Sequence, residues 1–168
     1  MKLSRSSILF AIVAVVLLTS VPTSIHRIIT TGDPYLFTKH FFQDMQARLT
    51  GSGKLRFIVQ PIVAIILGVL HAKKDVQANL PPFLWTIAFH ASHRQHALRT
   101  AVIGIRDVVA VAILLDIISQ ALIFREVRPG AALVLGPVLI AVPYSLAREL
   151  ANRTIRVRRP RTTAAGAL

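Results

Sequence analysis

The sequence predicts an all-α membrane protein with four transmembrane helices, amphipathic interfacial segments and both termini in the cytoplasm. Hydrophobic residues make up 54% of its 168 residues and charged residues only 16%, with a mean hydropathy of +0.60. This composition is too apolar for an ordinary soluble domain. Several apolar blocks approach the ~20 residues that a helix needs to cross a bilayer. Lys and Arg gather between these blocks, where they determine topology and contact anionic lipid headgroups.

The apolar blocks define one membrane domain at residues 1–152. We expect its spans at residues 8–29, 55–73, 101–124 and 131–148. The first block follows Lys2 and Arg5 and therefore begins like a signal peptide. Its apolar pattern continues, however, and no convincing small-residue cleavage site follows it. We therefore favour an uncleaved first span over a cleaved signal.

The orientation of the chain follows from its basic residues. Four spans place both termini on one side, which together with the second loop carries twelve Lys and Arg, against seven on the other side. By the positive-inside rule, the termini are cytoplasmic. Residues 153–168 combine a basic run with small residues and little apolar material, so we expect a disordered basic tail. Such tails commonly contact lipid, and we do not expect nucleic acid as a partner.

Two connecting segments predict helices at the membrane interface. In the first loop, Asp33 and Pro34 are a helix-start signal and residues 51–53 (Gly-Ser-Gly) are a stop. One helical face between these signals is apolar and consists of Phe37, Phe41, Phe42, Met45 and Leu49. This face suits either lipid headgroups or packing on the protein's own spans. In the second loop, we expect a cytoplasmic interfacial helix that begins at Phe83 and runs through the His-rich segment.

Polar residues within the expected spans predict a buried cluster. An ionised side chain at mid-bilayer costs at least ~2.5–3.5 kcal/mol on insertion scales, and Asp116 lies near the middle of the apolar run 106–124. Residues four apart share a helical face, which groups Asp116 with Gln120 and Arg56 with Gln60. The two spans run antiparallel, so the outer end of one lies next to the outer end of the other, and both residue pairs lie there. We therefore expect Asp116, Gln120, Gln60 and Arg56 to form an intramembrane polar cluster.

Two interpretations of this cluster remain open. Asp116 could exchange a proton or bind a cation, or the cluster could join the helices and fix their register, each hydrogen bond contributing ~0.6–2 kcal/mol. The structural interpretation is favoured. On each helix, the residues that extend the polar pair at intervals of four are small, and small residues allow helices to approach closely in lipid. They are Ala64, Gly68, Ala72, Gly104 and Ala112.

A second polar level lies at the cytoplasmic edge of the membrane. Arg106 and Asp107 lie near the inner end of the third span, where they can reach water or meet Tyr144 of the fourth span. Asp107 is about half a turn round the helix from Asp116, so the two acids cannot form a catalytic pair. We interpret this level as structural.

A weak metal-site candidate lies in the second loop. Imidazoles that could ligate zinc or copper recur every three residues, at His90, His93 and His96. Basic residues intervene and little acidic support is nearby. A solvated basic face is therefore the favoured interpretation, and we expect no metal.

Catalytic signatures are absent from the sequence. Nothing resembles a nucleophile elbow, a phosphate loop, a zinc-protease helix or a paired-carboxylate hydrolase site. The chain contains no Cys, which excludes disulfides, thiolate metal sites and thiol redox catalysis. We expect neither a catalytic residue nor a cofactor.

Three segments of the chain carry a resemblance. They are RFIVQPIVAIILGVL, PPFLW and DIISQALIFREVRPGAALVLGPVLIAVPYSLAREL. Together they resemble, over about residues 55–152, a family of small uncharacterised bacterial multi-pass inner-membrane proteins with no assigned activity. The resemblance implies a bacterial inner-membrane location and adds no chemistry.

These observations favour a non-enzymatic membrane protein that assembles with itself or with another membrane protein. The alternative is a small transporter or proton-coupled channel built around Asp116, which would have to be oligomeric because four short spans enclose little cavity. A lipid-modifying enzyme that uses the His-rich segment or Asp107 is the least favoured class.

Overall fold

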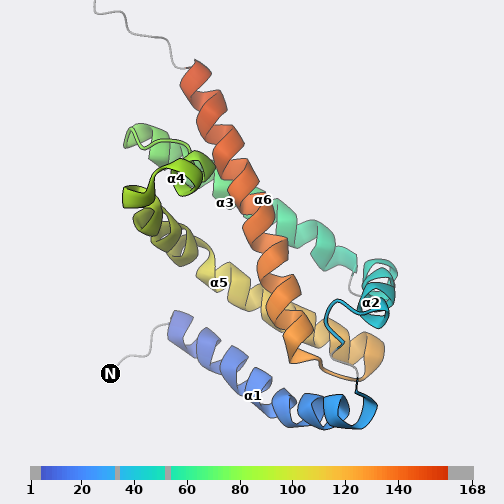
Figure 1. Cartoon of the computed structure of the whole chain (residues 1–168). Helices are drawn as coiled ribbons and strands as arrows, with labels where there is room; N and C mark the ends of the chain where they lie inside the picture. The colour runs from blue at the N-terminus through green and yellow to red at the C-terminus, as the bar shows by residue number, and fades with distance from the viewer. Residues whose placement is uncertain (1–4, 33–34, 52–53, 159–168) are drawn as a thin grey trace, which may run out of the picture.

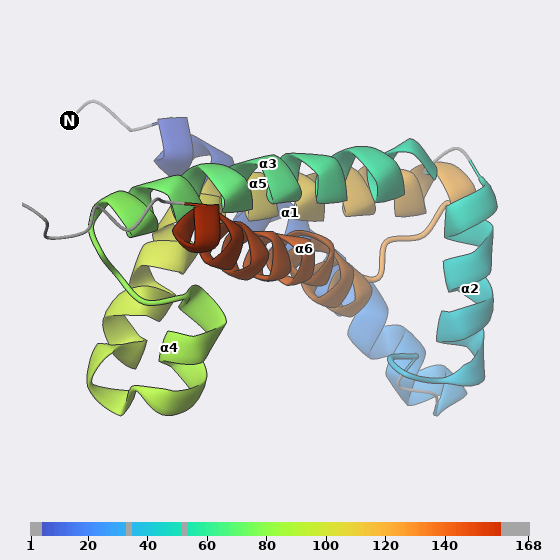
Figure 2. The ribbon, with the colours of Figure 1, turned by 90° about the horizontal axis from the view of Figure 1, so that it is seen from above.

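The computed structural model describes residues 5–32, 35–51 and 54–158, and these residues confirm the all-α prediction. They form six helices: α1 (Arg5–Thr31), α2 (Lys39–Thr50), α3 (Lys54–Gln77), α4 (Phe83–Phe89), α5 (Ala91–Phe124) and α6 (Pro129–Arg158). Figures 1 and 2 show α2 at the end of the molecule where α1 and α5 finish and where α3 and α6 begin. Helix α4 lies toward the opposite end. We call these the α2 end and the α4 end.

Three of the described helices are long and apolar enough to cross a membrane, by length and composition. They are α1, α3 and α6, which contain the expected spans 8–29, 55–73 and 131–148. Membrane association is therefore plausible. The third expected span, 101–124, is the second part of α5, which is not among these three helices. The 34 residues of α5 extend for about 51 Å, well beyond the ~30 Å hydrocarbon core.

Helix α6 packs against both α3 and α5. The expected row from Arg56 through Gly68 to Ala72 is indeed the buried face of α3. Its middle, however, packs on α6 and not on α5 as expected. The contact is close at Gly68, where a Cβ would lie 2.6 Å from the backbone oxygen of Tyr144 and 3.0 Å from the Cβ of Ala147. The missing side chain therefore allows the backbones of α3 and α6 to approach closely.

Other small residues allow the remaining contacts of α5. A Cβ at Gly136 of α6 would lie 2.9 Å from Ile113, and one at Gly104 of α5 would lie 2.6 Å from the His71 ring. Buried apolar residues from α3, α4, α5 and α6 join in one cluster around these contacts: Ala64, Phe83, Ala101, Ile105, Ala112, Ile140 and Tyr144. The helices are thus held in the middle by apolar packing, and their polar groups lie toward the two ends.

The apolar face expected in the first loop could contact lipid headgroups or pack on the protein's own spans, and the segment at helix α2 has both a packed and an open side. The helix begins after Thr38, whose hydroxyl accepts a hydrogen bond from the Phe41 amide. The expected start signal at 33–34 lies outside the described residues. Phe41 is buried in a cluster with residues at the start of α6, whereas Phe37 and Phe42 are exposed. One side of the segment therefore packs on the protein, and the other side is open.

The helix ends at Thr50, with Gly51 at the expected stop. Ser52 and Gly53, the rest of that signal, are not described.

The expected interfacial helix in the second loop is wrong in its extent. Helix α4 ends at Phe89, and His90 adopts non-helical dihedral angles (φ −119°, ψ 83°). The other two His residues of the segment belong to α5, which continues without a break to Phe124. The third expected span and the His-rich segment are therefore parts of one helix.

The prediction of disorder from residue 153 onward is also wrong for the described part of the tail, because α6 continues to Arg158. Arg153 forms an ion pair with Glu149, and Arg156 donates a hydrogen bond to Asn152 at 2.8 Å. Such pairs four residues apart stabilise a helix. Residues 159–168 lie outside the description.

Replacing Gly68 by Ala should destabilise the protein by about 1–3 kcal/mol, because the added methyl group must displace the backbone of α6. Thermal unfolding of the purified protein, followed by circular dichroism, measures the effect. Val59→Ile also adds one carbon to α3, but on an exposed position, and should leave the unfolding temperature unchanged. Equal unfolding temperatures for Gly68→Ala and the native chain would contradict the close α3–α6 contact.

Candidate functional site

The carboxylate of Asp116 is bound at the α2 end by side chains from three helices. Its Oδ1 accepts a hydrogen bond from Arg48 Nη1 of α2 at 3.0 Å, and its Oδ2 accepts one from Gln120 Nε2 of α5 at 2.6 Å. Arg56 of α3 forms an ion pair with Oδ1. Asp116 and Gln120 are 0% exposed, Arg48 is 1% exposed and Arg56 is 6% exposed. We call these four residues with Gln60 the Asp116 cluster.

The expected members of the cluster do not all bind Asp116. Arg56 and Gln120 contact it directly. Gln60 is also buried, but its side chain has no hydrogen-bond partner among the described residues. Its position one turn after Arg56 places it on the correct face of α3 without pairing it to the carboxylate.

Arg48 is the residue of this cluster that sequence reasoning missed, since it is one of the seven Lys and Arg counted on the outer side. A signal was present, because Arg48 follows Phe41 by seven residues and therefore shares its helical face. Phe41 and Arg48 are the two buried residues of α2. The helix thus uses one face both for apolar packing and for binding Asp116.

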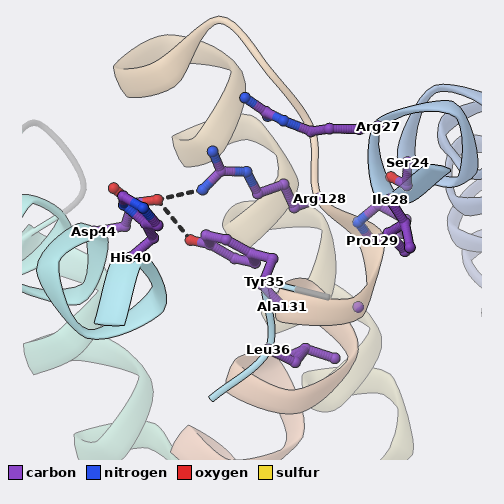
Figure 3. Close-up of a pocket in the computed structure, with 11 residues that line it drawn as sticks. Ser24, Arg27, Ile28, Tyr35, Leu36, His40, Asp44, Arg128, Pro129 and Ala131 are labelled. Atoms are coloured by element: carbon purple, nitrogen blue, oxygen red, sulfur yellow. Dashed lines mark hydrogen bonds and ion pairs between the residues drawn. The ribbon is translucent and has the colours of Figure 1, made fainter. Parts of the chain in front are cut away.

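A pocket lies at the α2 end of the molecule (Figure 3). Its volume is about 460 Å³, and it is lined by the end of α1, by the following loop, by α2 and by the start of α6. Gln120 connects the two sites, because its Oε1 accepts a hydrogen bond from the backbone N–H of Arg128 at 2.7 Å. Residues that line the pocket include Ser24, Arg27, Ile28, Tyr35, Leu36, His40, Asp44, Arg128 and Pro129.

Within the pocket, Asp44 joins Tyr35 to Arg128. The Tyr35 hydroxyl donates a hydrogen bond to Asp44 at 2.7 Å, and the Arg128 guanidinium forms an ion pair with the same carboxylate oxygen (Figure 3). The Arg128 guanidinium also stacks 3.8 Å from the centre of the Tyr35 ring. These contacts fix the loop before α2 against the loop before α6.

The protonation of Tyr35 and Arg128 suits this arrangement. Burial raises the pKa of the Tyr35 phenol, and the hydrogen bond to Asp44 raises it further. Burial lowers the pKa of Arg128, but its contacts with Tyr35 and Asp44 more than offset this, so the pKa is raised overall. Tyr35 therefore stays a hydrogen-bond donor and Arg128 stays a cation at physiological pH.

A second buried network lies toward the α4 end. Asp75 accepts two hydrogen bonds from Arg148, at 2.7 and 2.8 Å, in a bidentate pair. Arg148 Nη1 donates to the Tyr144 hydroxyl at 3.0 Å, and this hydroxyl lies 2.9 Å from Nδ1 of His71. The network therefore connects α3 with α6.

Tyr144 consequently does not join Arg106 and Asp107, contrary to the sequence prediction. Arg106 and Asp107 form an exposed ion pair with each other, and Asp107 accepts a hydrogen bond from Ser6 of α1 at 3.0 Å. They lie on the part of α5 that faces α1, whereas Tyr144 points toward α3. The expected inner polar level is therefore two separate groups.

The structure does not bring the three His residues of the second loop together into a metal site. His90, His93 and His96 are all exposed. No group of three or more His, Cys, Asp or Glu side chains in the described ranges is arranged to hold a metal ion.

No protein-family model, curated protein or solved structure matches this chain significantly. The side chains themselves therefore have to indicate the function. In both buried networks, the carboxylates are bound by guanidinium groups of the same chain. Such pairs hold helices together and leave these acids poorly placed for acid–base catalysis.

Replacing Asp116 by Asn should destabilise the protein strongly, by about 3–5 kcal/mol, because two buried guanidinium groups lose their only anionic partner in the cluster. Asp107→Asn is the matched control. Asp107 is paired but 53% exposed, so its substitution should change the unfolding temperature little. An Asp116→Asn variant that unfolds at the native temperature would show that the Asp116 cluster is not a structural joint.

Proposed function

We propose that the chain is a multi-pass protein of the bacterial inner membrane, with α1, α3, α5 and α6 as its four spans and both termini in the cytoplasm. Its role is non-enzymatic assembly with a second copy of itself, and α1 is the contact helix. The single observation that carries this proposal is the sparse packing of α1 against the rest of its own chain. The inner-membrane assignment rests on the sequence resemblance to small bacterial membrane proteins.

The distribution of charges supports the proposed topology. Of the basic residues expected outside, Arg48 and Arg56 bind Asp116, Arg128 binds Asp44, and Arg27 binds Glu126. Arg148 and Arg153 on the other side are likewise paired, with Asp75 and Glu149, so pairing does not alter the Lys and Arg count on which the topology rests. Exposed lysines at the α4 end, such as Lys73 and Lys74, are available to anionic headgroups. The larger number of Lys and Arg on that side favours a cytoplasmic α4 end.

The geometry of Asp116 supports a structural role over transport. A carboxylate that carries protons or cations needs a path by which they can reach and leave it. Asp116 is fully buried and is bound by two guanidinium groups and an amide. No observation in the described residues favours the transport alternative.

Helix α1 is sparsely packed compared with the other candidate spans. Only 6% of its most apolar window is buried, against 28% for α3 and 33% for α6. Val13 faces α5, whereas Ser7 and Ala11 line a shallow apolar groove on the surface of α1. Small residues four apart allow a second helix to approach closely in lipid. A second α1, related by a two-fold axis, would place the same groove on both sides of the contact.

Single-cysteine variants can test the topology, because the chain contains no Cys. Lys39→Cys lies at the α2 end and should react with a membrane-impermeant maleimide in intact cells. Lys74→Cys, toward the α4 end, should react only after the membrane is permeabilised. Both native lysines are exposed, so a difference in labelling reports the side of the membrane. The opposite labelling pattern would invert the topology, and labelling of both in intact cells would exclude α3 as a span.

Oxidative cross-linking tests the assembly. Ala11→Cys, on the open groove of α1, should form a disulfide-linked dimer in membranes, detected by non-reducing electrophoresis. Val13→Cys lies two residues further along α1 but faces α5, and it should remain monomeric. If Ser7→Cys, Ala11→Cys and Val15→Cys all remain monomeric, α1 is not a self-assembly surface. A disulfide adduct of another mass would also overturn self-assembly.

A further inference from the structure

The Asp116 cluster carries more positive than negative charge. It contains two guanidinium groups, from Arg48 and Arg56, and one carboxylate. Helix α2 carries the carboxylate of Asp44 one turn before Arg48. This carboxylate is bound by Arg128 and Tyr35 on the pocket side. It therefore does not neutralise the second arginine. One positive charge remains uncompensated among side chains that are almost completely buried.

The cluster also contains more hydrogen-bond donors than acceptors. Asp116 takes up Nη1 of Arg48 and Nε2 of Gln120, while Oε1 of Gln120 is occupied by the backbone N–H of Arg128. Several buried side-chain atoms have no hydrogen-bond partner in the described part of the chain: Arg48 Nε and Nη2, Arg56 Nε and Nη2, and Gln60 Nε2 and Oε1. All of these atoms except one are donors.

Aromatic rings lie near both guanidinium groups, but they leave the N–H donors of these groups without an acceptor. The Arg56 guanidinium carbon lies 4.7 Å from the centre of the Phe57 ring, and that of Arg48 lies 5.5 Å from the Phe124 ring. Ring faces stabilise a cation electrostatically. They do not supply a conventional hydrogen-bond acceptor for the unpaired N–H groups, and a buried donor without an acceptor is destabilising.

We propose that Arg48, Arg56 and Gln60 form a buried binding site for a small monovalent anion of the chloride type. Such an ion has one negative charge, which balances the surplus guanidinium, and accepts hydrogen bonds without donating any. Both properties match what the cluster lacks. The Gln60 amide adds a neutral donor one turn after Arg56 on the same buried face of α3. The bound anion becomes an internal part of the joint between α2 and α3, and is not a transported substrate.

The experiment measures the unfolding temperature of the purified full-length chain in lipid nanodiscs, in sodium chloride, bromide or gluconate at equal ionic strength. Gluconate is too large for a buried single-ion site. Chloride and bromide should raise the unfolding temperature relative to gluconate, and the increase should grow with the logarithm of halide concentration, as expected when a ligand binds only the folded state. Line broadening of the chloride NMR signal, reversed by bromide, would report the binding directly.

Two variants locate the effect within the cluster. Gln60→Leu removes a side chain without a hydrogen-bond partner among the described residues, so the chain should fold but gain less stability from chloride. Gln46→Leu makes the same change on an exposed position of α2 and should respond like the native chain. Arg48→Gln removes the surplus charge while keeping a donor toward Asp116, and it should abolish the chloride response.

Two results would overturn the proposal. If the native chain unfolds at the same temperature in chloride and in gluconate, water molecules complete the cluster and no anion site exists. If Gln60→Leu keeps the full chloride response, the anion binds elsewhere. Because Gln60→Leu leaves the ion pairs of Asp116 intact, the site remains testable even if Arg48→Gln fails to fold.

Discussion

The burial of one carboxylate, that of Asp116, determines how the α2 end is built. An acid in an apolar environment needs charged or hydrogen-bonding partners, and here these come from Arg48 on α2, Arg56 on α3 and Gln120 on its own helix. The requirement draws α2 over the end of the helices and fixes the point where α3 meets α5. Gln120 extends the same constraint to the loop before α6 through the Arg128 amide.

The periodicity of the sequence predicted which residues of the long helices are buried but not which helix covers them. The row from Arg56 to Ala72 is the buried face of α3. A glycine such as Gly68 permits close approach by any neighbouring helix, so the pattern alone cannot choose between α5 and α6. That choice depends on the geometry of the whole chain, in which α6 packs against both of the others.

The site was predictable where its partners share a helix or follow from antiparallel spans, as with Gln120 and Arg56. It was not predictable where a partner comes from a connecting segment. Arg48 looked like a topology signal because a basic residue in a loop ordinarily remains in water. Tyr144 was assigned to the wrong group because its depth along α6 was apparent but its direction around the helix was not. The helix end was similarly misjudged at Arg153, where an ion pair with Glu149 and the hydrogen bond of Arg156 to Asn152 support α6 beyond its apolar part.

The distribution of polar groups limits what the chain can do. Asp116 and Asp75, the buried aspartates at the two ends, are each bound by arginine, and the middle of the structure is apolar and rich in small residues. Groups that hold each other in this way are poorly placed to act on a substrate. Our two proposals rest on the sparsely packed face of α1 and on the surplus positive charge beside Asp116. An apolar helix face attracts helices or lipid and a buried cation attracts an anion, and this is the physical reason why we propose contacts with other molecules at these two places.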